Sequence, residues 1–199
     1  MGLNIDPFSF PDPDLTEAAQ SGKRSIVLGG GCFWCTEAVY TQLEGVLSVR
    51  PGYAGDSQET ADYETVCTGR TNHAEVIEVV YEPAKLALGQ ILKIFFSIAH
   101  DPTQKDRQGA DVGRQYRSVI FYSNEEQKKV AQAYIEQLTK LKAFDAPIVT
   151  ELKPLPDYYK AEAYHQNYFR QNPMQGYCAY IVAPKVAKFR KTFSDRLNH

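Results

Sequence analysis

The sequence predicts an α+β fold, a sandwich in which helices pack on a mixed, largely antiparallel sheet. Strand-like and helix-like patterns alternate along the chain, and several of the links between them are short. Short links join antiparallel neighbours, whereas an all-parallel sheet needs long crossover connections. A chain of 199 residues, 43% of them apolar, can bury one core without disulfide bonds. We expect an extended N-terminal arm over residues 1–22 and a single folded domain over residues 23–199.

The expected strands are short runs of β-prone residues bounded by turn signals. The first leads into three consecutive glycines at 29–31, which indicate a tight turn. Pro51-Gly52 marks a loop after the second strand. The third runs from Glu75 to Tyr81, is rich in valine and isoleucine, and is the clearest strand of the chain. In chain order, the expected strands cover residues 25–28, 46–49, 75–81, 118–122, 148–151 and 178–182.

The expected helices repeat apolar residues at the spacing of one helical face. The first main helix opens at Cys32, and Gly45 stops it. Ser123 and Glu126 have the spacing of a capping box at the start of the third. In chain order, helices are expected near 15–20 in the arm, then at 32–44, 88–99, 124–141, 161–169 and in the basic tail at 185–196.

Charge and hydropathy exclude several classes of partner. Lys and Arg number 22 and Asp and Glu number 24, so the formal charge is −2. A near-neutral chain is a poor counter-ion for a phosphate backbone, so we expect no nucleic-acid partner. The start of the chain lacks the pattern of a signal peptide, and the apolar stretch at 91–99 is too short to span a membrane. We therefore expect a cytoplasmic monomer that binds no membrane.

The four cysteines are Cys32, Cys35, Cys67 and Cys178. They are too few and too unevenly spaced for a disulfide scaffold. In a reducing compartment such cysteines are free thiols, metal ligands or redox catalysts.

Cys32 follows the glycines and opens a helix. A helix N-terminus carries partial positive charge and unpaired N–H groups, which favour the thiolate and lower the pKa of a cysteine. We therefore expect Cys32 to be a nucleophile, although a free cysteine is also a common small core residue. Phe33 and Trp34 follow directly. Their rings could form a pocket for a methyl group next to sulfur, or pack as ordinary core.

Several motifs follow one another along the chain: Gly31-Cys32-Phe33-Trp34 followed by Glu37, and the segments at 63–69, 73–76, 111–118, 165–168 and 172–178. Together, in this order, they resemble the class A peptide-methionine (S)-S-oxide reductases. The resemblance covers about Ser25 to Val182 and implies a ferredoxin-like α/β sandwich with residues 23–199 as the catalytic domain. It also implies thiol-dependent repair of the S epimer of methionine sulfoxide, free or in oxidised proteins.

The resemblance assigns roles to the matching positions. Cys32 would attack the sulfoxide sulfur while Glu75 protonates the oxygen, and Tyr63 and Tyr116 would hydrogen-bond that oxygen. A carboxyl desolvated among apolar strand residues has a raised pKa and can act as an acid near neutrality. Without the resemblance, Glu75 would be read as a solvent-facing strand residue. The expected substrate-binding positions are Phe33, Trp34, Asp111, His165 and Tyr168.

The implied reaction leaves Cys32 as a sulfenic acid, which condenses with a second thiol to a disulfide. Cys178 matches the family's resolving position, and Cys35 is an alternative resolving thiol. No cysteine follows Cys178, so the disulfide would be reduced directly by thioredoxin or a small dithiol. No metal and no tightly bound cofactor is implied. Cys67 is expected to be buried and inert.

Two other readings use the same residues. Cys32-x-x-Cys35 after a strand also suits a thioredoxin-like disulfide oxidoreductase, which would leave Glu75 and Cys178 without roles. A structural zinc site would need four well-spaced ligands, and the chain has no second Cys-x-x-Cys or His pair.

Overall fold

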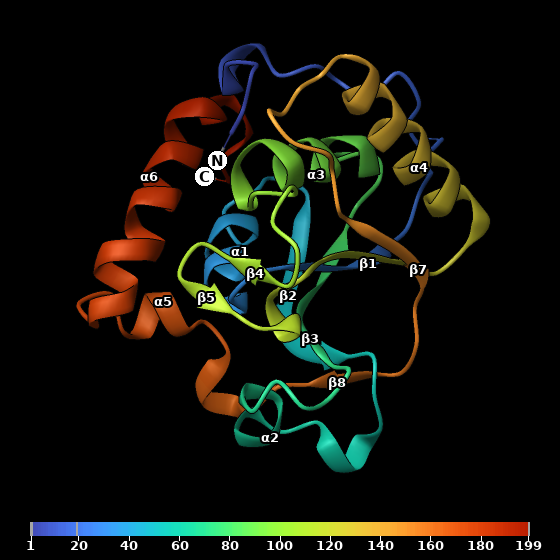
Figure 1. Cartoon of the computed structure of the whole chain (residues 1–199). Coiled ribbons are helices and arrows are strands. Elements are labelled where there is room, and N and C mark those ends of the chain that lie inside the picture. The colour runs from blue at the N-terminus through green and yellow to red at the C-terminus, as the bar shows by residue number, and fades with distance from the viewer. Residues whose placement is uncertain (1, 19, 199) are drawn as a thin grey trace.

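The computed structural model describes residues 2–18 and 20–198. A six-stranded sheet forms its centre (Figure 1). In spatial order its strands are β7 (Glu151–Pro154), β6 (Ser118–Tyr122), β1 (Arg24–Gly30), β3 (Ala74–Tyr81), β2 (Val46–Ala54) and β8 (Tyr158–Lys160). Only β6 and β7 pair in parallel, and the other neighbours are antiparallel. The predicted α+β class with a mixed, largely antiparallel sheet is therefore confirmed.

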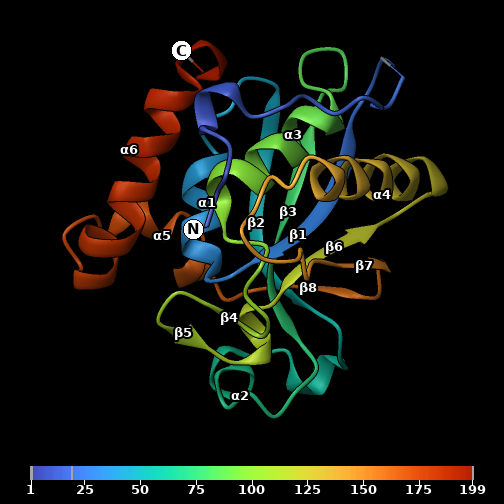
Figure 2. The ribbon, with the colours of Figure 1, turned by 45° about the horizontal axis from the view of Figure 1, so that its top comes forward.

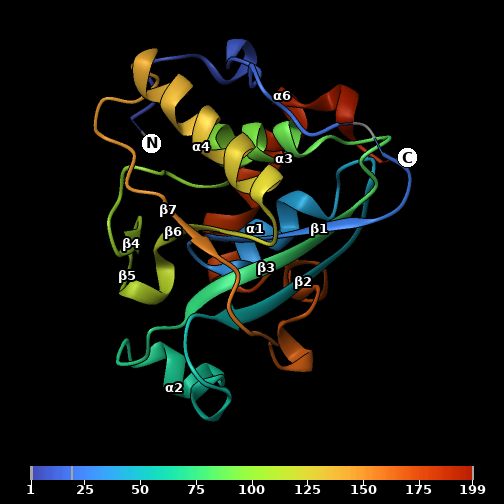
Figure 3. The same cartoon turned by 90° about the vertical axis from the view of Figure 1, so that its right-hand side faces the viewer.

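The helices are α1 (Phe33–Tyr40), α2 (Tyr63–Cys67), α3 (Leu88–Ile94), α4 (Glu125–Lys140), α5 (Tyr168–Gln171) and α6 (Ala183–Thr192). Figure 3 shows α1, α3 and α4 on one face of the sheet. Leu28 and Ile77 point into the main core on this face, while their strand neighbours Val27 and Val76 belong to a second cluster that Leu155 covers. The period of two along a strand explains this division, and both faces of the central strands are buried.

The C-terminal third differs most from the sequence prediction. The expected strand at 178–182 is instead a turn of π-helix, Cys178–Val182, that runs into α6. The expected helix at 161–169 is broken into a 3₁₀ turn at Ala163–His165 and the short α5. Asn167 separates the two, because its φ of 56° is left-handed and cannot continue a right-handed helix.

Two local signals were misleading. Pro51-Gly52 does not end β2, because the strand continues with Pro51 opposite Ile77 and the Pro51 carbonyl accepts a hydrogen bond from the Ala161 N–H. The predicted capping box at Ser123 is also wrong. Asn124 is the N-cap of α4, and its side chain accepts a hydrogen bond from the Gln127 N–H. The strand expected at 148–151 begins three residues later, as β7.

The N-terminal arm packs against the helices. Its described residues contain a 3₁₀ turn at Pro7–Ser9 but no helix at 11–18, so the helix predicted near 15–20 is absent from the part that is described. Figure 2 shows the arm passing across α3 toward α4. Phe10 is buried, and Glu17 accepts a hydrogen bond from the Leu88 N–H at 3.1 Å. The division into arm and single domain stays a prediction.

Candidate active site

Cys32 is the N-cap of α1, as the glycines at 29–31 predict. Gly31 makes the turn between β1 and α1 with a φ of 85°, and a Cβ there would come within 2.7 Å of the Gln108 side chain. Only glycine combines this left-handed conformation with that close approach. The turn therefore delivers the Cys32 thiol to a fixed position at the end of a central strand.

The environment of Cys32 corrects one expectation. The backbone N–H of Trp34 donates a hydrogen bond to the Cys32 sulfur and lowers the pKa of Cys32, as expected at a helix start. Burial acts more strongly in the opposite direction and raises the pKa of Cys32 well above its ordinary value, and a hydrogen bond with Cys35 adds to this. The same hydrogen bond lowers the pKa of Cys35. Cys32 is thus a thiol in this structure, not the thiolate that the sequence predicts.

Glu75 lies directly beside the start of α1. Its Oε2 accepts a hydrogen bond from the Phe33 N–H at 3.1 Å, and only 2% of the residue is exposed. Burial raises the pKa of Glu75 to about 8, although the Phe33 N–H acts to lower it. The carboxyl is therefore a neutral acid near pH 7. Phe33, the residue that it contacts, directly follows Cys32 in the chain.

Tyr63 and Tyr116 are in electrostatic range of this acid. Burial is the largest cause that raises the pKa of each phenol, and the charge of Glu75 contributes to both. Tyr63 begins α2, where its N–H donates to Glu162 at 3.1 Å. Cys67, at the end of α2, is exposed and its thiol hydrogen-bonds the Tyr63 side chain. The prediction that Cys67 is buried is wrong, because a five-residue helix leaves its last residue uncovered.

An aromatic wall, here defined as Phe33, Trp34, His165 and Tyr168, stands beside Cys32. The Trp34 and Tyr168 rings stack with centroids 3.8 Å apart, and the Phe33 and His165 rings are 4.9 Å apart. Trp34 Nε1 donates to His165 Nδ1 at 3.0 Å. Because indole N–H can only donate, the His165 proton sits on Nε2, and burial lowers the pKa of the ring. All four members of the wall were predicted substrate-binding positions.

A cavity of about 260 Å³ opens beside the two N-terminal cysteines. Tyr177 Oη donates to Asp111 Oδ2 at 2.5 Å and lies 3.8 Å from the Cys35 sulfur. Lys185 also lines this cavity, and its charge contributes to the lowered pKa of Cys35. Sequence reasoning gave no role to Tyr177 or Lys185. The one available signal was that Tyr177 directly precedes Cys178.

Cys178 is completely buried in one apolar cluster with Cys32 and Cys35. We call these three residues the thiol cluster. Burial and the charge of Cys35 raise the pKa of Cys178, so the two sulfurs are in electrostatic range. Residues 32 and 178, which lie far apart in the sequence, thus belong to one buried cluster.

The arrangement joins a buried thiol, a neutral carboxylic acid, two phenols and an aromatic wall. Such a set can bind a small group with an apolar methyl and a polar oxygen, attack it with sulfur and protonate the oxygen. Within the described residues 2–18 and 20–198, no three His, Cys, Asp or Glu side chains lie close enough to hold a metal ion. None of the described helices is long and apolar enough to cross a membrane.

A family model described as peptide methionine sulfoxide reductase matches residues 24–197 of the chain. The peptide methionine sulfoxide reductase MsrA of Trichodesmium erythraeum is 51% identical over 174 residues, covering 87% of this chain and 98% of that protein. MsrA 2 of Synechocystis sp. is 48% identical and covers 97% of this chain and 93% of that protein.

Solved structures share the fold. Methionine sulfoxide reductase A of Corynebacterium diphtheriae aligns with a TM-score of 0.69 at 34% identity, covering 90% of this chain and 91% of that one. Mxr1 of Saccharomyces cerevisiae in reduced form aligns with a TM-score of 0.71 at 33% identity, covering 83% and 94%. A structure of Mxr1 in complex with Trx2 aligns with a TM-score of 0.50 at 25% identity, covering 80% and 94%.

Proposed function

The chain belongs to the peptide methionine sulfoxide reductase family, and we propose that it reduces the S epimer of methionine sulfoxide to methionine, free or within proteins. This activity repairs oxidised proteins. The family match and the sheet order argue against the thioredoxin-like alternative.

One observation carries the proposal. The buried Glu75 carboxyl, whose pKa of about 8 keeps it protonated at neutral pH, is fixed to the Phe33 N–H at 3.1 Å, next in the chain to Cys32. Sulfoxide reduction needs a neutral acid beside the thiol, because the oxygen leaves the sulfur only as it becomes protonated.

In the first step the Cys32 sulfur attacks the sulfoxide sulfur and Glu75 transfers its proton to the oxygen. The Cys32 thiol proton replaces the one that Glu75 gives, so the site stays neutral overall. Tyr63 and Tyr116 donate hydrogen bonds to the oxygen as its charge grows. The substrate sulfur then loses both its bond to the oxygen and its new bond to the Cys32 sulfur. The hydroxyl passes to Cys32 as a sulfenic acid, and methionine leaves.

In the second step the Cys178 thiol attacks the sulfenic sulfur, a Cys32–Cys178 disulfide forms, and water leaves. The shared burial of the two residues in the thiol cluster supports this pairing. Cys35 is the second candidate, favoured by its hydrogen bond with Cys32. A dithiol then reduces the disulfide by exchange, taking the oxidising equivalents.

We assign the dithiol to thioredoxin, a partner class supported by the complex of Mxr1 with Trx2. We also propose a reducing cytoplasmic compartment, in which the cysteines return to free thiols after each turnover. We further propose that the chain acts as a monomer without a metal or tightly bound cofactor.

The proposal is tested by mixing reduced enzyme with one equivalent of S or R methionine sulfoxide in a short peptide. We expect methionine from the S epimer alone, with loss of one pair of thiols per methionine formed. Reduction of both epimers would overturn the epimer assignment. Methionine formation without thiol loss would overturn the cysteine chemistry.

A further inference from the structure

Glu37 is a buried acid that the proposed reaction does not use. It lies on α1, one turn beyond Trp34, and only 2% of the residue is exposed. Burial raises the pKa of its carboxyl to about 7, and the N–H groups of Asn167 and Tyr168 act to lower it. A buried carboxyl without a reaction partner calls for a structural reason, because its desolvation is costly.

The contacts of Glu37 supply that reason. Its Oε1 accepts a hydrogen bond from the Asn167 N–H at 2.7 Å, and the Tyr168 N–H also bonds the carboxyl. Asn167 is left-handed, with φ 56° and ψ 34°, and its own side chain does not cap the helix that follows. A non-glycine residue in this conformation is strained and persists only where its surroundings hold it. Glu37 therefore holds this backbone bend from the neighbouring helix.

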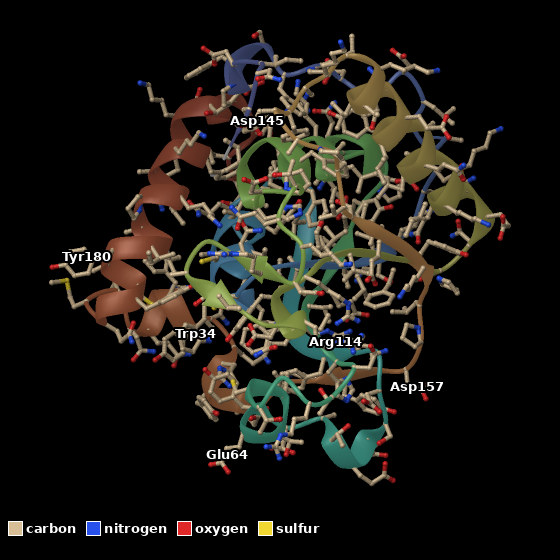
Figure 4. The ribbon with its side chains drawn as sticks, viewed as in Figure 1. Trp34, Glu64, Arg114, Asp145, Asp157 and Tyr180 are labelled. Carbon is tan, nitrogen blue, oxygen red and sulfur yellow. The ribbon has the colours of Figure 1, made fainter. Side chains whose placement is uncertain are left out.

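The bend determines where two members of the aromatic wall stand. His165 lies two residues before Asn167 and Tyr168 one residue after it, and both contact Trp34. Figure 4 places Trp34 beside this C-terminal segment. Helix α1 thus carries both Trp34 and Glu37, and Glu37 fixes the segment whose His165 and Tyr168 pack against Trp34.

We propose that Glu37 is a positioning residue that fixes the 165–168 segment and through it the Trp34 face of the pocket for the sulfoxide methyl group. This role rests on the proposed function. Glu37 touches neither Cys32 nor the reacting atoms, so it acts on binding of the substrate and not on the chemical step.

Glu37→Ala tests the proposal, because it leaves the Asn167 and Tyr168 N–H groups without their acceptor. We expect the sulfoxide concentration for half-maximal single-turnover rate to rise about 10-fold, the smaller end of what a methyl contact contributes. The limiting rate at saturation stays within about twofold, the pattern of lost uniform binding. Glu37→Gln keeps an acceptor oxygen and gives a smaller rise.

A second readout needs no turnover. Trp34 is the only tryptophan, so its fluorescence reports on the wall alone. We expect acrylamide to quench Trp34 more strongly in Glu37→Ala than in the wild type, with Glu37→Gln in between. If the alanine variant does not fold, the glutamine variant carries both measurements.

Tyr40→Phe is the matched control. Tyr40 is also buried on α1, and its hydroxyl donates to the Ile91 carbonyl at 2.8 Å, away from the 165–168 segment. The Tyr40→Phe variant loses one buried hydrogen bond of α1 and leaves the aromatic wall unchanged.

If the half-saturating sulfoxide concentration and the Trp34 quenching in the Glu37 variants equal those of Tyr40→Phe, the positioning role is overturned. A lowered limiting rate with unchanged half-saturation overturns it as well. A wild type that reduces no sulfoxide rejects the proposed function instead, while the quenching comparison still decides the role of Glu37 in holding Trp34.

Discussion

The two ends of the proposed disulfide lie in regions of different construction. Cys32 follows a central strand that pairs on both sides, and its neighbour Phe33 is fixed to Glu75 by a hydrogen bond of 3.1 Å. Cys178 begins a turn of π-helix between exposed side chains, with Met174 88% and Tyr180 81% exposed. Figure 4 shows Tyr180 at the outer edge of the molecule.

This difference suits the two halves of the reaction. Attack on the sulfoxide needs a thiol and an acid at fixed positions, and rigid elements provide such precision. The proposed disulfide formation and its proposed reduction by thioredoxin need a buried sulfur to move and become accessible. A π-helical turn beside an irregular loop has fewer regular backbone contacts to break than a strand has. We therefore assign the proposed attack on the sulfoxide to the sheet end of the site and the proposed exchange to the C-terminal segment.

Replacing the sulfur at the rigid end has the largest expected effect. Cys32→Ser removes the nucleophile, and methionine formation in a single turnover should fall by at least about 10³-fold, the scale of losing a nucleophile. Peptide methionine is measured by mass spectrometry. Serine is close in size, so the melting temperature should stay near that of the wild type. Substantial residual methionine would remove Cys32 from its role.

Replacing the sulfur at the C-terminal end separates the two proposed half-reactions. Cys178→Ser should still form one methionine per enzyme and leave Cys32 oxidised, but thioredoxin-driven cycling should stop. Cys35→Ser is the paired test, and Cys67→Ser, outside the thiol cluster, should cycle normally. If Cys178→Ser cycles and Cys35→Ser does not, the resolving thiol is Cys35 and the C-terminal segment loses its exchange role.

Glu75 allows a test of the proposed proton transfer at the sheet end of the site. Glu75→Gln cannot give a proton, and we expect the first step to slow by roughly 100-fold or more, the range for loss of a general acid. In the wild type the rate should be level below the pKa of about 8 and fall as Glu75 ionises above it. Glutamine should abolish this fall. A wild-type profile that rises through pH 8 would mean that an ionised group is the active form.

The same carboxyl gives a stability prediction with a definite sign. Because burial raises its pKa to about 8, the folded chain binds this proton more tightly than the unfolded chain does. The contribution to the free energy of unfolding is full below the unfolded pKa of about 4.3 and is lost as pH rises toward 8. The free energy of unfolding of Glu75→Gln minus that of the wild type should therefore increase from about pH 5 to pH 8. Urea unfolding at the two pH values measures this difference. An equal difference at both pH values would contradict the buried acid.

The sequence predicts the sheet end better than the C-terminal end for a physical reason. The turn at Gly31, the helix start at Cys32 and the valine- and isoleucine-rich run of β3 are local signals, and each produced the expected element. The apolar run at 178–182 has no period, so a strand and a helix could not be told apart. It became a π-helical turn because Cys178 and Val182 pack in the apolar cluster with Cys32.

The site follows the same division. The residues proposed to carry chemistry were identified because their motifs resemble a family. The contacts that hold other residues in place were missed, because they join positions far apart in the sequence. Glu37 and Asn167 are 130 positions apart, and Tyr177 and Asp111 are 66 apart. No local pattern of either pair indicates that the chain brings them together.

The smallest expected effect concerns a contact that ties the C-terminal segment to the site, the hydrogen bond between Tyr177 and Asp111. Tyr177 directly precedes the buried Cys178, and its Oη donates a hydrogen bond to Asp111 Oδ2 at 2.5 Å. Tyr177→Phe removes this bond, so the segment should open more often and iodoacetamide should alkylate Cys178 about threefold faster, as loss of one hydrogen bond allows. Tyr180→Phe makes the same change at an exposed ring and should leave the alkylation rate unchanged. The rate of the first step should not change in either variant. If alkylation of Cys178 is unaffected by Tyr177→Phe, this contact does not restrain the segment, and the contrast between the two ends then rests on the backbone alone.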